Sequence, residues 1–475
     1  MLYARRCAVA ESRSARRNFG PSATQSASRL MRVDGIWTQP GAAVQQAPGN
    51  AYFKQAWRAD LYKPEFPLLT VSPMIQRLLW QRKVTGMANS YIYDGIRTPF
   101  GRFGKSLAGV RPDDLAAHVI RELVARHPDL EPARIGDVIL GDTNGAGEDN
   151  RNVARMASLL AGLPTSVPGT TLNRLCGSGM EAVIQASRAI EVGDTDLVLS
   201  GGVESMSRAP WILAKPERAY PAGPETLHSS TVGWRMVNPE MPVDWTVSNG
   251  ETAEILADRF RISRQAQDEF AARSHRLADA AWNAGIYDDE VVSMPGTTLL
   301  RDEGIRADTS VEALAALKPA FRSDGSVTAG NSSPLNDGAA ALFIGREGAL
   351  ATEPLARIVS RGVAGVDPNI FGIAPVEAAN RALARAGKTW GDVDVVELNE
   401  AFASQSLACL SLWPDLDPEK VNIHGGALAI GHPLGASGAR ILLHLARELE
   451  RRGGGIGVAA ICIGVGQGLA VVLER

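Results

Sequence analysis

Residues 393–402 read Val-Asp-Val-Val-Glu-Leu-Asn-Glu-Ala-Phe, a short and mostly apolar run that ends in polar residues. Such a run predicts a strand that is buried on both faces, as in a sheet covered by helices on each side. Residues 137–144 read Asp-Val-Ile-Leu-Gly-Asp-Thr-Asn and have the same character, again with an asparagine at the end. The two runs indicate that one structural unit occurs twice in the chain.

The sequence after each run continues this repeat. Cys176 lies 32 residues beyond Asn144, and His432 lies 33 residues beyond Asn399. A glycine-rich stretch, a helical pattern and a further strand-like run follow both residues in the same order. We therefore expect Cys176 and His432 at equivalent helix entrances, and a site between the two halves could receive both side chains.

Strand-like and helical patterns alternate across 87–475, which predicts an α/β architecture. Strands are expected at 91–93, 137–140, 197–200, 341–344, 393–398, 457–462 and 469–473. Helices are expected at 112–125, 179–191, 264–284, 375–386 and 437–452. The segment 206–327 fits neither half, and its Trp, Pro and charged residues predict an inserted, partly helical region that contributes to binding.

Residues 1–86 differ in composition from the rest. They contain ten Arg and three Lys against two Asp and two Glu, a formal charge of +9 (13 − 4). The Arg-, Ser- and Ala-rich start is typical of an organellar transit peptide. Two interpretations stay open, a targeting or regulatory extension and a disordered sequence translated upstream of a start at Met87. We favour the second and assign no chemistry to this segment or to Cys7.

The composition argues against several classes of protein. The whole chain has a formal charge of −3, so residues 87–475 carry about −12 (−3 − 9), which argues against a nucleic-acid partner. Four Cys make no disulfide framework, and no run of about 18 apolar residues could span a membrane. Neither C-x-x-C nor H-E-x-x-H occurs, so no metal site is expected. The G-x-G-x-x-A pattern at 455–460 precedes a strand instead of following one, so we expect no nicotinamide cofactor.

Three residues carry the candidate chemistry. Cys176 precedes a helical pattern, and the exposed N–H groups and dipole of a helix start favour a thiolate. His432 is followed by Pro433, which fits the first turn of a helix, and imidazole is the natural base for a thiol near neutral pH. Cys462 lies where a strand ends in glycines, so its thiol can reach a ligand and free N–H groups there can hold an oxyanion.

For other polar residues and one cysteine near these motifs, the sequence gives weaker evidence of a catalytic role. Asn399 lies at the end of a predicted strand, where ligands collect in α/β folds, and it could hold a water or a carbonyl group. Glu400 is expected to be structural, His424 to be a strand or loop histidine, and Cys409 to be a core residue on a helix.

Four motifs in this order resemble those of the thiolases (acetyl-CoA acyltransferases): Cys176-Gly-Ser-Gly, Asn399-Glu-Ala-Phe, Gly431-His-Pro-Leu-Gly and Cys462-Ile-Gly. The resemblance covers essentially all of 87–475. It implies a thiolase-like fold, in which two α/β halves form layers in the order α-β-α-β-α and carry an inserted loop domain. The expected segments are an extension at 1–86, a first half at 87–205, the loop domain at 206–327, a return to the first half at 328–349 and a second half at 350–475.

The resemblance also implies a role for each motif residue. Cys176 would be the acylated nucleophile, and His432 would activate first this thiol and then the thiol of the incoming CoA. Cys462 would be the second acid/base, which protonates the acetyl-CoA carbanion during cleavage. Asn399, through a water, and His432 would form one oxyanion hole, and the N–H groups of Cys176 and Gly464 would form the other.

Substrates and partners follow from the same resemblance. It implies CoA as a co-substrate with no tightly bound cofactor, acyl-CoA as the other substrate, and a homodimer or homotetramer. Ser333 matches the serine that contacts pantetheine, Arg306 and Phe321 match positions near the nucleotide end, and Ser248 is a further expected CoA contact. We expect a cytoplasmic protein without membrane contact, or a mitochondrial one if 1–86 is a real transit segment.

The sequence departs from the family pattern at three places. Val465 stands where the family usually has Gly, Ser248-Asn249 replaces the His-Met of short-chain biosynthetic members, and Phe371 replaces a Met near the acyl pocket. Residues 232–239, Val-Gly-Trp-Arg-Met-Val-Asn-Pro, resemble degradative members that include 3-oxoadipyl-CoA thiolases. We therefore expect thiolysis of a 3-oxoacyl-CoA.

Three other functions remain open at this point. The first is condensation of two acetyl-CoA molecules to acetoacetyl-CoA, which would use the same residues. The second is a catalytically silent thiolase-like protein that binds acyl-CoA or lipid, and the third is an unrelated Cys–His hydrolase. The presence of both Cys176 and Cys462 argues against the last two.

Overall fold

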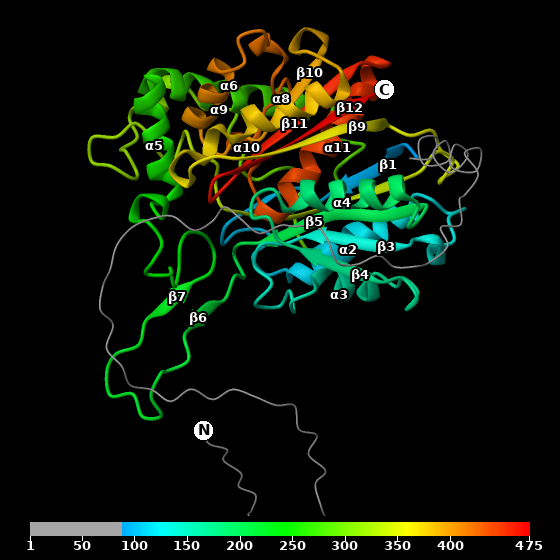
Figure 1. Ribbon diagram of the computed structural model, residues 1–475, viewed down its shortest axis with the longest axis horizontal. Coiled ribbons are helices and arrows are strands. Elements are labelled where there is room, and N and C mark those ends of the chain that lie inside the picture. The colour runs from blue at the N-terminus through cyan, green and yellow to red at the C-terminus, as the bar shows by residue number, and fades with distance from the viewer. Residues whose placement is uncertain (1–87) are drawn as a thin grey trace, which may run out of the picture. The chain divides into compact units, whose positions relative to one another are not determined.

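The computed structural model describes residues 88–475 (Figure 1). The expectations for residues 1–86, including the one for Cys7, lie outside this range. Within it, no helix is both long and apolar enough to cross a membrane.

The strands of 88–475 form one large sheet and a separate two-stranded hairpin. The sheet has ten strands in the order β10-β11-β12-β9-β1-β8-β5-β3-β4, with β2 paired to β8. Their bounds are β1 Ser90–Arg97, β2 Gly101–Arg102, β3 Asp137–Gly141, β4 Gly169–Leu172, β5 Leu197–Ser205, β8 Asn336–Gly345, β9 Ala356–Gly365, β10 Val395–Leu398, β11 Ile456–Ile463 and β12 Gln467–Glu474. Strand β1 joins the two halves, because it pairs antiparallel with β8 on one side and with β9 on the other.

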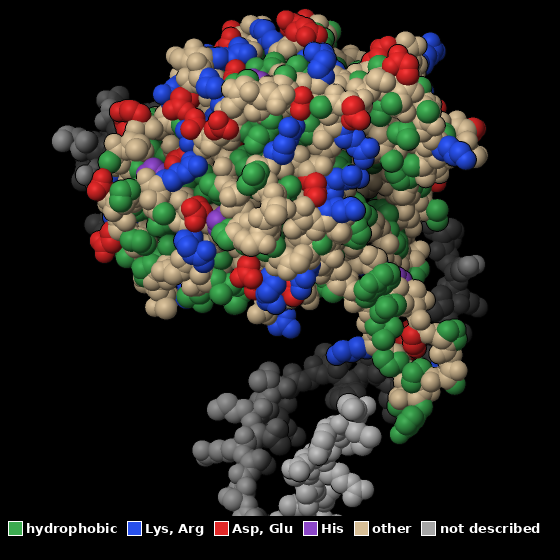
Figure 2. Space-filling view, turned by 180° about the vertical axis from the view of Figure 1, so that it is seen from behind, with side chains coloured by type: hydrophobic (Ala, Val, Ile, Leu, Met, Phe, Trp, Pro, Cys, Tyr) green, Lys and Arg blue, Asp and Glu red, His purple; other side chains and the backbone are tan. Residues whose placement is uncertain are grey.

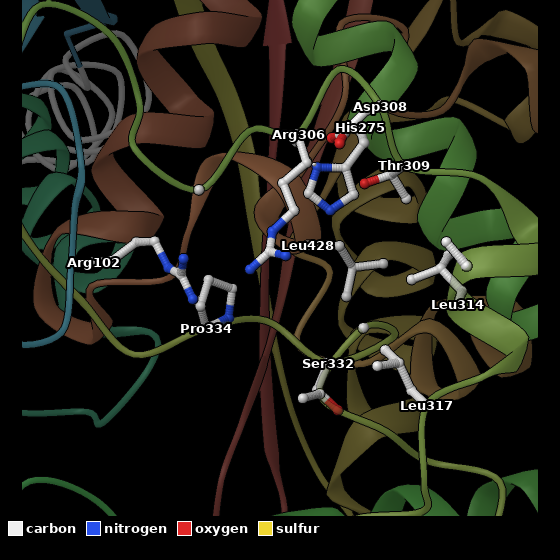
Figure 3. Close-up of a pocket in the computed structure, with 14 residues that line it drawn as sticks. Arg102, His275, Arg306, Asp308, Thr309, Leu314, Leu317, Ser332, Pro334 and Leu428 are labelled. Carbon is white, nitrogen blue, oxygen red and sulfur yellow. Dashed lines mark hydrogen bonds between the residues drawn. The ribbon is translucent and has the colours of Figure 1, made fainter.

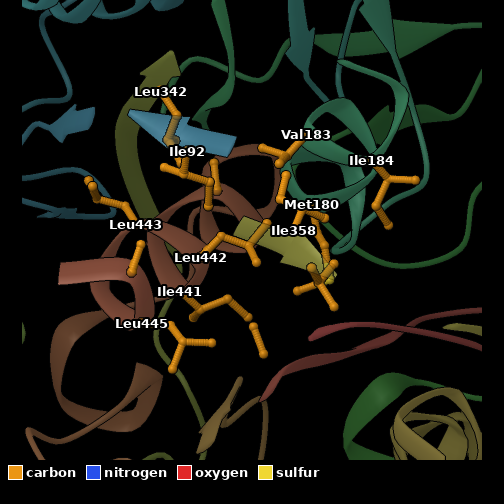
Figure 4. Close-up of a cluster of buried hydrophobic side chains, with 14 of the residues drawn as sticks. Ile92, Met180, Val183, Ile184, Leu342, Ile358, Ile441, Leu442, Leu443 and Leu445 are labelled. Atoms are coloured by element: carbon orange, nitrogen blue, oxygen red, sulfur yellow. The ribbon is translucent and has the colours of Figure 1, made fainter. Parts of the chain in front are cut away.

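Two long helices lie between the two parts of this sheet. Helix α4 (Ser178–Val192) packs on helix α11 (Leu434–Arg452), and their side chains form one core with strands from both halves. Figure 4 shows part of this core, where Met180, Leu442 and Ile358 come from α4, α11 and β9. A central helical layer shared by both halves therefore holds them together.

Further helices cover the outer faces of the sheet. Helices α2 (Pro112–Ala125) and α3 (Val153–Leu160) pack on the strands of the first half, and α8 (Ala374–Ala386) and α9 (Ala403–Ser411) pack on those of the second. A short helix, α10 (Ala427–Ile430), precedes α11. The expected order of layers, α-β-α-β-α, is confirmed.

Glycines allow α4 and α11 to approach closely at their N-terminal ends. A Cβ atom on Gly179 would lie 2.5 Å from the carbonyl oxygen of Gly435, and one on Gly438 would lie 2.3 Å from the backbone nitrogen of Met180. Interiors packed this tightly leave no room for an added methyl group. Small residues at these positions therefore keep the two helix starts side by side.

The residues between β5 and β8 form the inserted region. Its elements are β6 Trp211–Leu213, β7 Leu227–Ser229, α5 Asn249–Phe260, α6 Arg264–Asn283 and α7 Val311–Ala315. The β6–β7 hairpin projects from the two halves in Figure 1, and hydrophobic side chains gather on this projection in Figure 2. Trp211, Leu213 and Leu227 are among its exposed side chains.

All the strands and helices predicted from the sequence are present, with ends that differ by a few residues. Pro433 was expected in the first turn of α11 but is its N-cap, one position before that turn. Several elements were not predicted, among them helices α3, α5 and α9 and strands β4 and β9. Strand β9 is the longest of the missed strands. It alternates buried and half-buried residues and carries Arg357 and Arg361 on its half-buried face, so it lacks the continuous apolar run that marks a buried strand.

Candidate active site

Cys176 lies in a tight turn that leads into α4. The residue before it, Leu175, has a φ of 46°, a left-handed conformation that costs roughly 1–2 kcal/mol for a residue with a side chain. The Gly177 N–H donates to the carbonyl of Arg174 (3.0 Å), and the Ser178 hydroxyl donates to the carbonyl of Leu175 (2.7 Å). These bonds hold the turn so that Cys176, although only 8% exposed, lines a cavity.

His432 occupies the equivalent place in the second half, two residues before α11, as Cys176 lies two residues before α4. Its ring is oriented by Ser437. The Ser437 hydroxyl donates to the carbonyl of Pro433 (2.9 Å), so its oxygen accepts from Nδ1 of His432 (2.7 Å). The ring proton is therefore on Nδ1, and Nε2 is left as a proton acceptor.

Asn399 follows β10 and approaches this free nitrogen, with its Nδ2 3.4 Å from His432 Nε2. Asn399 is fully buried, and its Oδ1 has no hydrogen-bond partner among residues 88–475. An unpaired buried amide oxygen is costly, so this atom is a place for a water or a polar ligand atom. The next residue, Glu400, accepts from the Ser274 hydroxyl and from Nδ2 of Asn422 (both 2.7 Å) and is structural, as expected.

Cys462 lies near the end of β11, fully buried in a cluster with Phe371 and Ala401. Burial raises its pKa well above the ordinary value, and a charge on Cys176 would raise it further. A charge on Cys409 would act in the same direction. Cys409 is buried on α9, where its thiol donates to a backbone carbonyl (3.2 Å), and is a core residue as expected.

Burial opposes the effect that the helix start was expected to have on the Cys176 thiol. Burial raises the pKa of Cys176 to about 11, although the backbone N–H groups of Gly464 and of Cys176 itself lower it in part. Burial, together with the positive charge of Arg440, lowers the pKa of His432 to about 4. For both groups burial favours the neutral form, because a charged sulfur or imidazolium loses its water there.

Gly464 and Val465 form the turn after β11. The backbone N–H of Gly464 lowers the pKa of the Cys176 thiol in part, against the larger effect of burial. Val465 has a φ of 66°, which is rare for a β-branched residue, and its side chain lines a cavity beside Cys176.

Three cavities adjoin one another around this site. The Arg306 cavity (about 280 Å³) is lined by residues that include Arg102, His275, Arg306, Thr309, Ser332 and Pro334. The Phe321 cavity (about 460 Å³) is lined by residues that include Cys176, Asn249, Phe321, Ser332, Pro334 and His432. The Arg235 cavity (about 380 Å³) is lined by residues that include Asn173, Cys176, Trp234, Arg235, Asn249 and Val465. Cys176 lines both the Phe321 cavity and the Arg235 cavity, so these two cavities meet at the nucleophile.

The Arg306 cavity is lined by two arginines and one carboxylate, that of Asp308. In Figure 3 the guanidinium groups of Arg102 and Arg306 point into the same space, and neither forms an ion pair with another residue of 88–475. His275 accepts from the backbone N–H of Arg306 (3.2 Å), and burial and the charge of Arg306 lower its pKa to about 4. Two arginines without acidic partners suit an anion such as a phosphate group.

The residues predicted to contact CoA are distributed over two of these cavities. Ser248, Phe321 and Ser333 line the Phe321 cavity, and Arg306 lines the cavity named after it. The Ser248 side chain also caps α5. Ser332 lines both cavities, so one elongated ligand could contact all four predicted residues.

The sequence reasoning assigned no role to Arg102, Ser437 or Glu204. The Glu204 carboxylate, at the end of β5, accepts from the Gly435 N–H (2.9 Å) and so ties the start of α11 to the first half. Ser437 follows His432 by five residues across a helix start, and this spacing could have indicated a contact. Arg102 carries no local signal, because its neighbours in the cavity lie between 173 (275 − 102) and 326 (428 − 102) residues away in sequence.

Comparison with known proteins identifies the family. Residues 90–348 match the thiolase N-terminal domain, and residues 352–475 match the thiolase C-terminal domain. The chain belongs to the thiolase family. It is an acyltransferase that cleaves 3-oxoacyl-CoA with CoA, and the α/β fold and the family expected from its motifs are confirmed.

Two curated relatives and two solved structures illustrate the similarity. The beta-ketoadipyl-CoA thiolase of Escherichia coli is 52% identical over 402 residues, which cover 82% of this chain and all of that protein. A beta-ketoadipyl-CoA thiolase of Pseudomonas aeruginosa is 50% identical over 396 residues, 81% of this chain and 98% of that one. Human mitochondrial 3-ketoacyl-CoA thiolase in complex with CoA superposes with a TM-score of 0.77 at 38% identity, over 82% of this chain and 99% of that one. The Bacillus anthracis acetyl-CoA acetyltransferase reaches 0.75 at 42% identity over the same shares.

Proposed function

We propose that this thiolase cleaves a 3-oxoacyl-CoA whose acyl group ends in a carboxylate, of the kind represented by 3-oxoadipyl-CoA. The observation that carries the proposal is the 52% identity to a beta-ketoadipyl-CoA thiolase over that protein's full length. The polar pair Ser248-Asn249 beside Cys176 also supports a substrate more polar than a short alkyl chain.

In the first half-reaction, Cys176 attacks the ketone carbon C3 of the substrate. Nε2 of His432, unprotonated in the resting protein, takes the thiol proton as the bond forms, so that no free thiolate is needed beforehand. The N–H groups of Cys176 and Gly464 hold the new alkoxide. The C2–C3 bond then breaks, its electron pair passes to C2, and Cys462 gives C2 a proton to form acetyl-CoA.

The second half-reaction releases the shortened acyl group. The proton on His432 returns to Cys462, and His432 then takes the proton of the incoming CoA thiol. The CoA thiolate attacks the carbonyl carbon of the acyl group on Cys176. The Cys176 sulfur then leaves as a thiolate and regains its proton from His432. Asn399 contributes through a water that donates one hydrogen bond to its Oδ1 and one to the thioester oxygen of the departing acetyl-CoA. The lack of any other partner for Asn399 Oδ1 within 88–475 supports this role.

CoA binding is assigned to the two cavities on one side of Cys176. Arg306 and Arg102 would hold phosphate groups of the nucleotide end, and Phe321, Ser248 and Ser333 would line the path of the pantetheine chain. This order is supported by the shared lining of the cavities, because an extended CoA that starts at the two arginines reaches Cys176 with its sulfur end.

We also propose a homodimer or homotetramer in the bacterial cytoplasm. The bacterial relatives support the location. The exposed Trp211, Leu213 and Leu227 of the β6–β7 hairpin support an assembly, because apolar side chains on a projecting hairpin gain from being covered. Light scattering of the full chain measures the number of subunits.

The roles of the cysteines are tested with three single variants of the full chain. Cys176→Ala should abolish the acyl-enzyme that mass spectrometry detects after incubation with acetyl-CoA. Cys462→Ala should still be acylated but should not cleave 3-oxoadipyl-CoA. Cys409→Ala, a buried cysteine outside the site, serves as the matched control and should keep both reactions.

Each alternative function has its own outcome in the same experiment. Acyl on a residue other than Cys176 would contradict the assignment of the nucleophile. Absence of any acyl-enzyme in the unmodified chain would indicate a silent acyl-CoA binder, and acyl release that does not depend on CoA would indicate a hydrolase. Faster cleavage of acetoacetyl-CoA than of 3-oxoadipyl-CoA would favour the condensation reaction.

A further inference from the structure

The Arg235 cavity meets the Phe321 cavity at Cys176. Cys176 and Asn249 line both the Phe321 and the Arg235 cavity, but no residue lines both the Arg235 and the Arg306 cavity. A CoA thioester that lies along the first two cavities therefore brings its acyl group to the third. This assignment rests on the proposed function.

Arg235 is the one charged side chain that lines this cavity within the described part of the chain. It is half-buried, and no carboxylate or other side chain of 88–475 pairs with its guanidinium group. A guanidinium group that faces a cavity without an acidic partner favours an anionic ligand, and its planar fork matches the two oxygens of a carboxylate. The Phe321 cavity, in contrast, is lined by no Lys, Arg, Asp or Glu.

The surroundings of Arg235 hold it in position and supply further polar contacts. The neighbouring Trp234 donates from its indole nitrogen to the carbonyl of Val247 (3.1 Å), which anchors this loop to the residues before α5. Asn173 and Asn249 line the cavity with side-chain amides, which can donate to a carboxylate. The cavity thus combines one cation with neutral hydrogen-bond donors near the nucleophile.

We propose that Arg235 binds the terminal carboxylate of a dicarboxylic acyl group and thereby sets the substrate specificity of this thiolase. For 3-oxoadipyl-CoA, the group left on Cys176 after cleavage is a succinyl group, whose free carboxylate lies three carbon–carbon bonds from the carbon attached to sulfur. The Arg235 guanidinium receives that carboxylate in both half-reactions. Arg235 is a specificity residue and takes no part in bond breaking.

The test compares two substrates of equal chain length in the full chain, 3-oxoadipyl-CoA and the uncharged 3-oxohexanoyl-CoA. Arg235→Met should lower kcat/KM for 3-oxoadipyl-CoA by about 10- to 100-fold, the range expected when a charge-assisted hydrogen-bond pair is lost. It should leave the value for 3-oxohexanoyl-CoA within about threefold, because an uncharged chain forms no such pair. Arg235→Lys should give a kcat/KM for 3-oxoadipyl-CoA between those of the unmodified chain and Arg235→Met, because lysine keeps the charge but lacks the planar pair of N–H donors. Arg218→Met, on the same inserted region but outside the three cavities, is the matched control.

A second measurement separates binding of the acyl group from turnover. Acylation of Cys176 by succinyl-CoA and by butyryl-CoA is followed by mass spectrometry, and Arg235→Met should slow the first and spare the second. Equal losses for both substrate pairs would overturn the role of Arg235 while leaving the thiolase reaction intact. Failure of the unmodified chain to cleave either 3-oxoacyl-CoA would instead overturn the proposed function.

Discussion

Replacement of Ser437 by Ala tests how the imidazole is set for catalysis. The Ser437 oxygen accepts from Nδ1 of His432 (2.7 Å), and the hydroxyl is held by the carbonyl of Pro433 (2.9 Å). Both side chains are buried, so neither can exchange this bond for bulk water. The variant removes the side-chain oxygen that accepts the ring proton on Nδ1.

The expected loss follows from the change in charge on the ring. A hydrogen bond from neutral imidazole contributes about 1 kcal/mol, whereas one from the imidazolium that forms when Cys176 loses its proton contributes about 1.5–3 kcal/mol. The difference, about 0.5–2 kcal/mol, stabilises only the transition state. We therefore expect acylation of Cys176 to slow by about 2- to 30-fold in Ser437→Ala.

Single-turnover acylation by acetyl-CoA, quenched at short times and read by mass spectrometry, measures this rate. Ser158→Ala is the matched control, because Ser158 is also fully buried on a helix and donates to a carbonyl of its own helix (2.9 Å), but lies on α3 away from the site. An acylation rate in Ser437→Ala within twofold of the unmodified chain, with His432→Asn inactive, would refute this account of the ring.

Two further predictions concern packing and titration. Gly179→Ala places a methyl group 2.5 Å from the Gly435 carbonyl oxygen, so the free energy of unfolding in urea should fall by about 1–3 kcal/mol. The control Gly109→Ala meets open space and should change this free energy little. Equal stability of both variants would contradict the close approach of α4 and α11. Burial raises the pKa of Cys176 to about 11, so the rate of its alkylation by iodoacetamide should rise about tenfold per pH unit from pH 7 to 9, in proportion to the thiolate fraction. A rate that levels off with a midpoint below pH 8 would show instead that the resting thiol is acidic.

Much of the fold could be predicted because it is encoded locally. The buried strands near 137 and 393 are short apolar runs, and the helices that follow Cys176 and His432 have helical spacing and glycine ends, so the duplicated α/β unit is visible in the order of the residues. The catalytic candidates could be predicted from the motifs at these helix starts. Strand β9 could not, since its half-buried arginines hide the apolar pattern.

The sequence by itself determined the alternation of elements, the repeat, the inserted region and the four motifs, because each depends on residues close together in the chain. Only the tertiary structure decided that β1 joins both halves, that burial raises the pKa of Cys176 and lowers that of His432, and that Arg102 and Arg235 line two separate cavities. Pairing across the sheet, loss of water and the lining of a cavity all depend on residues that are distant in sequence. Local patterns carry no information about such contacts, and the charges and substrate contacts of this site depend on them.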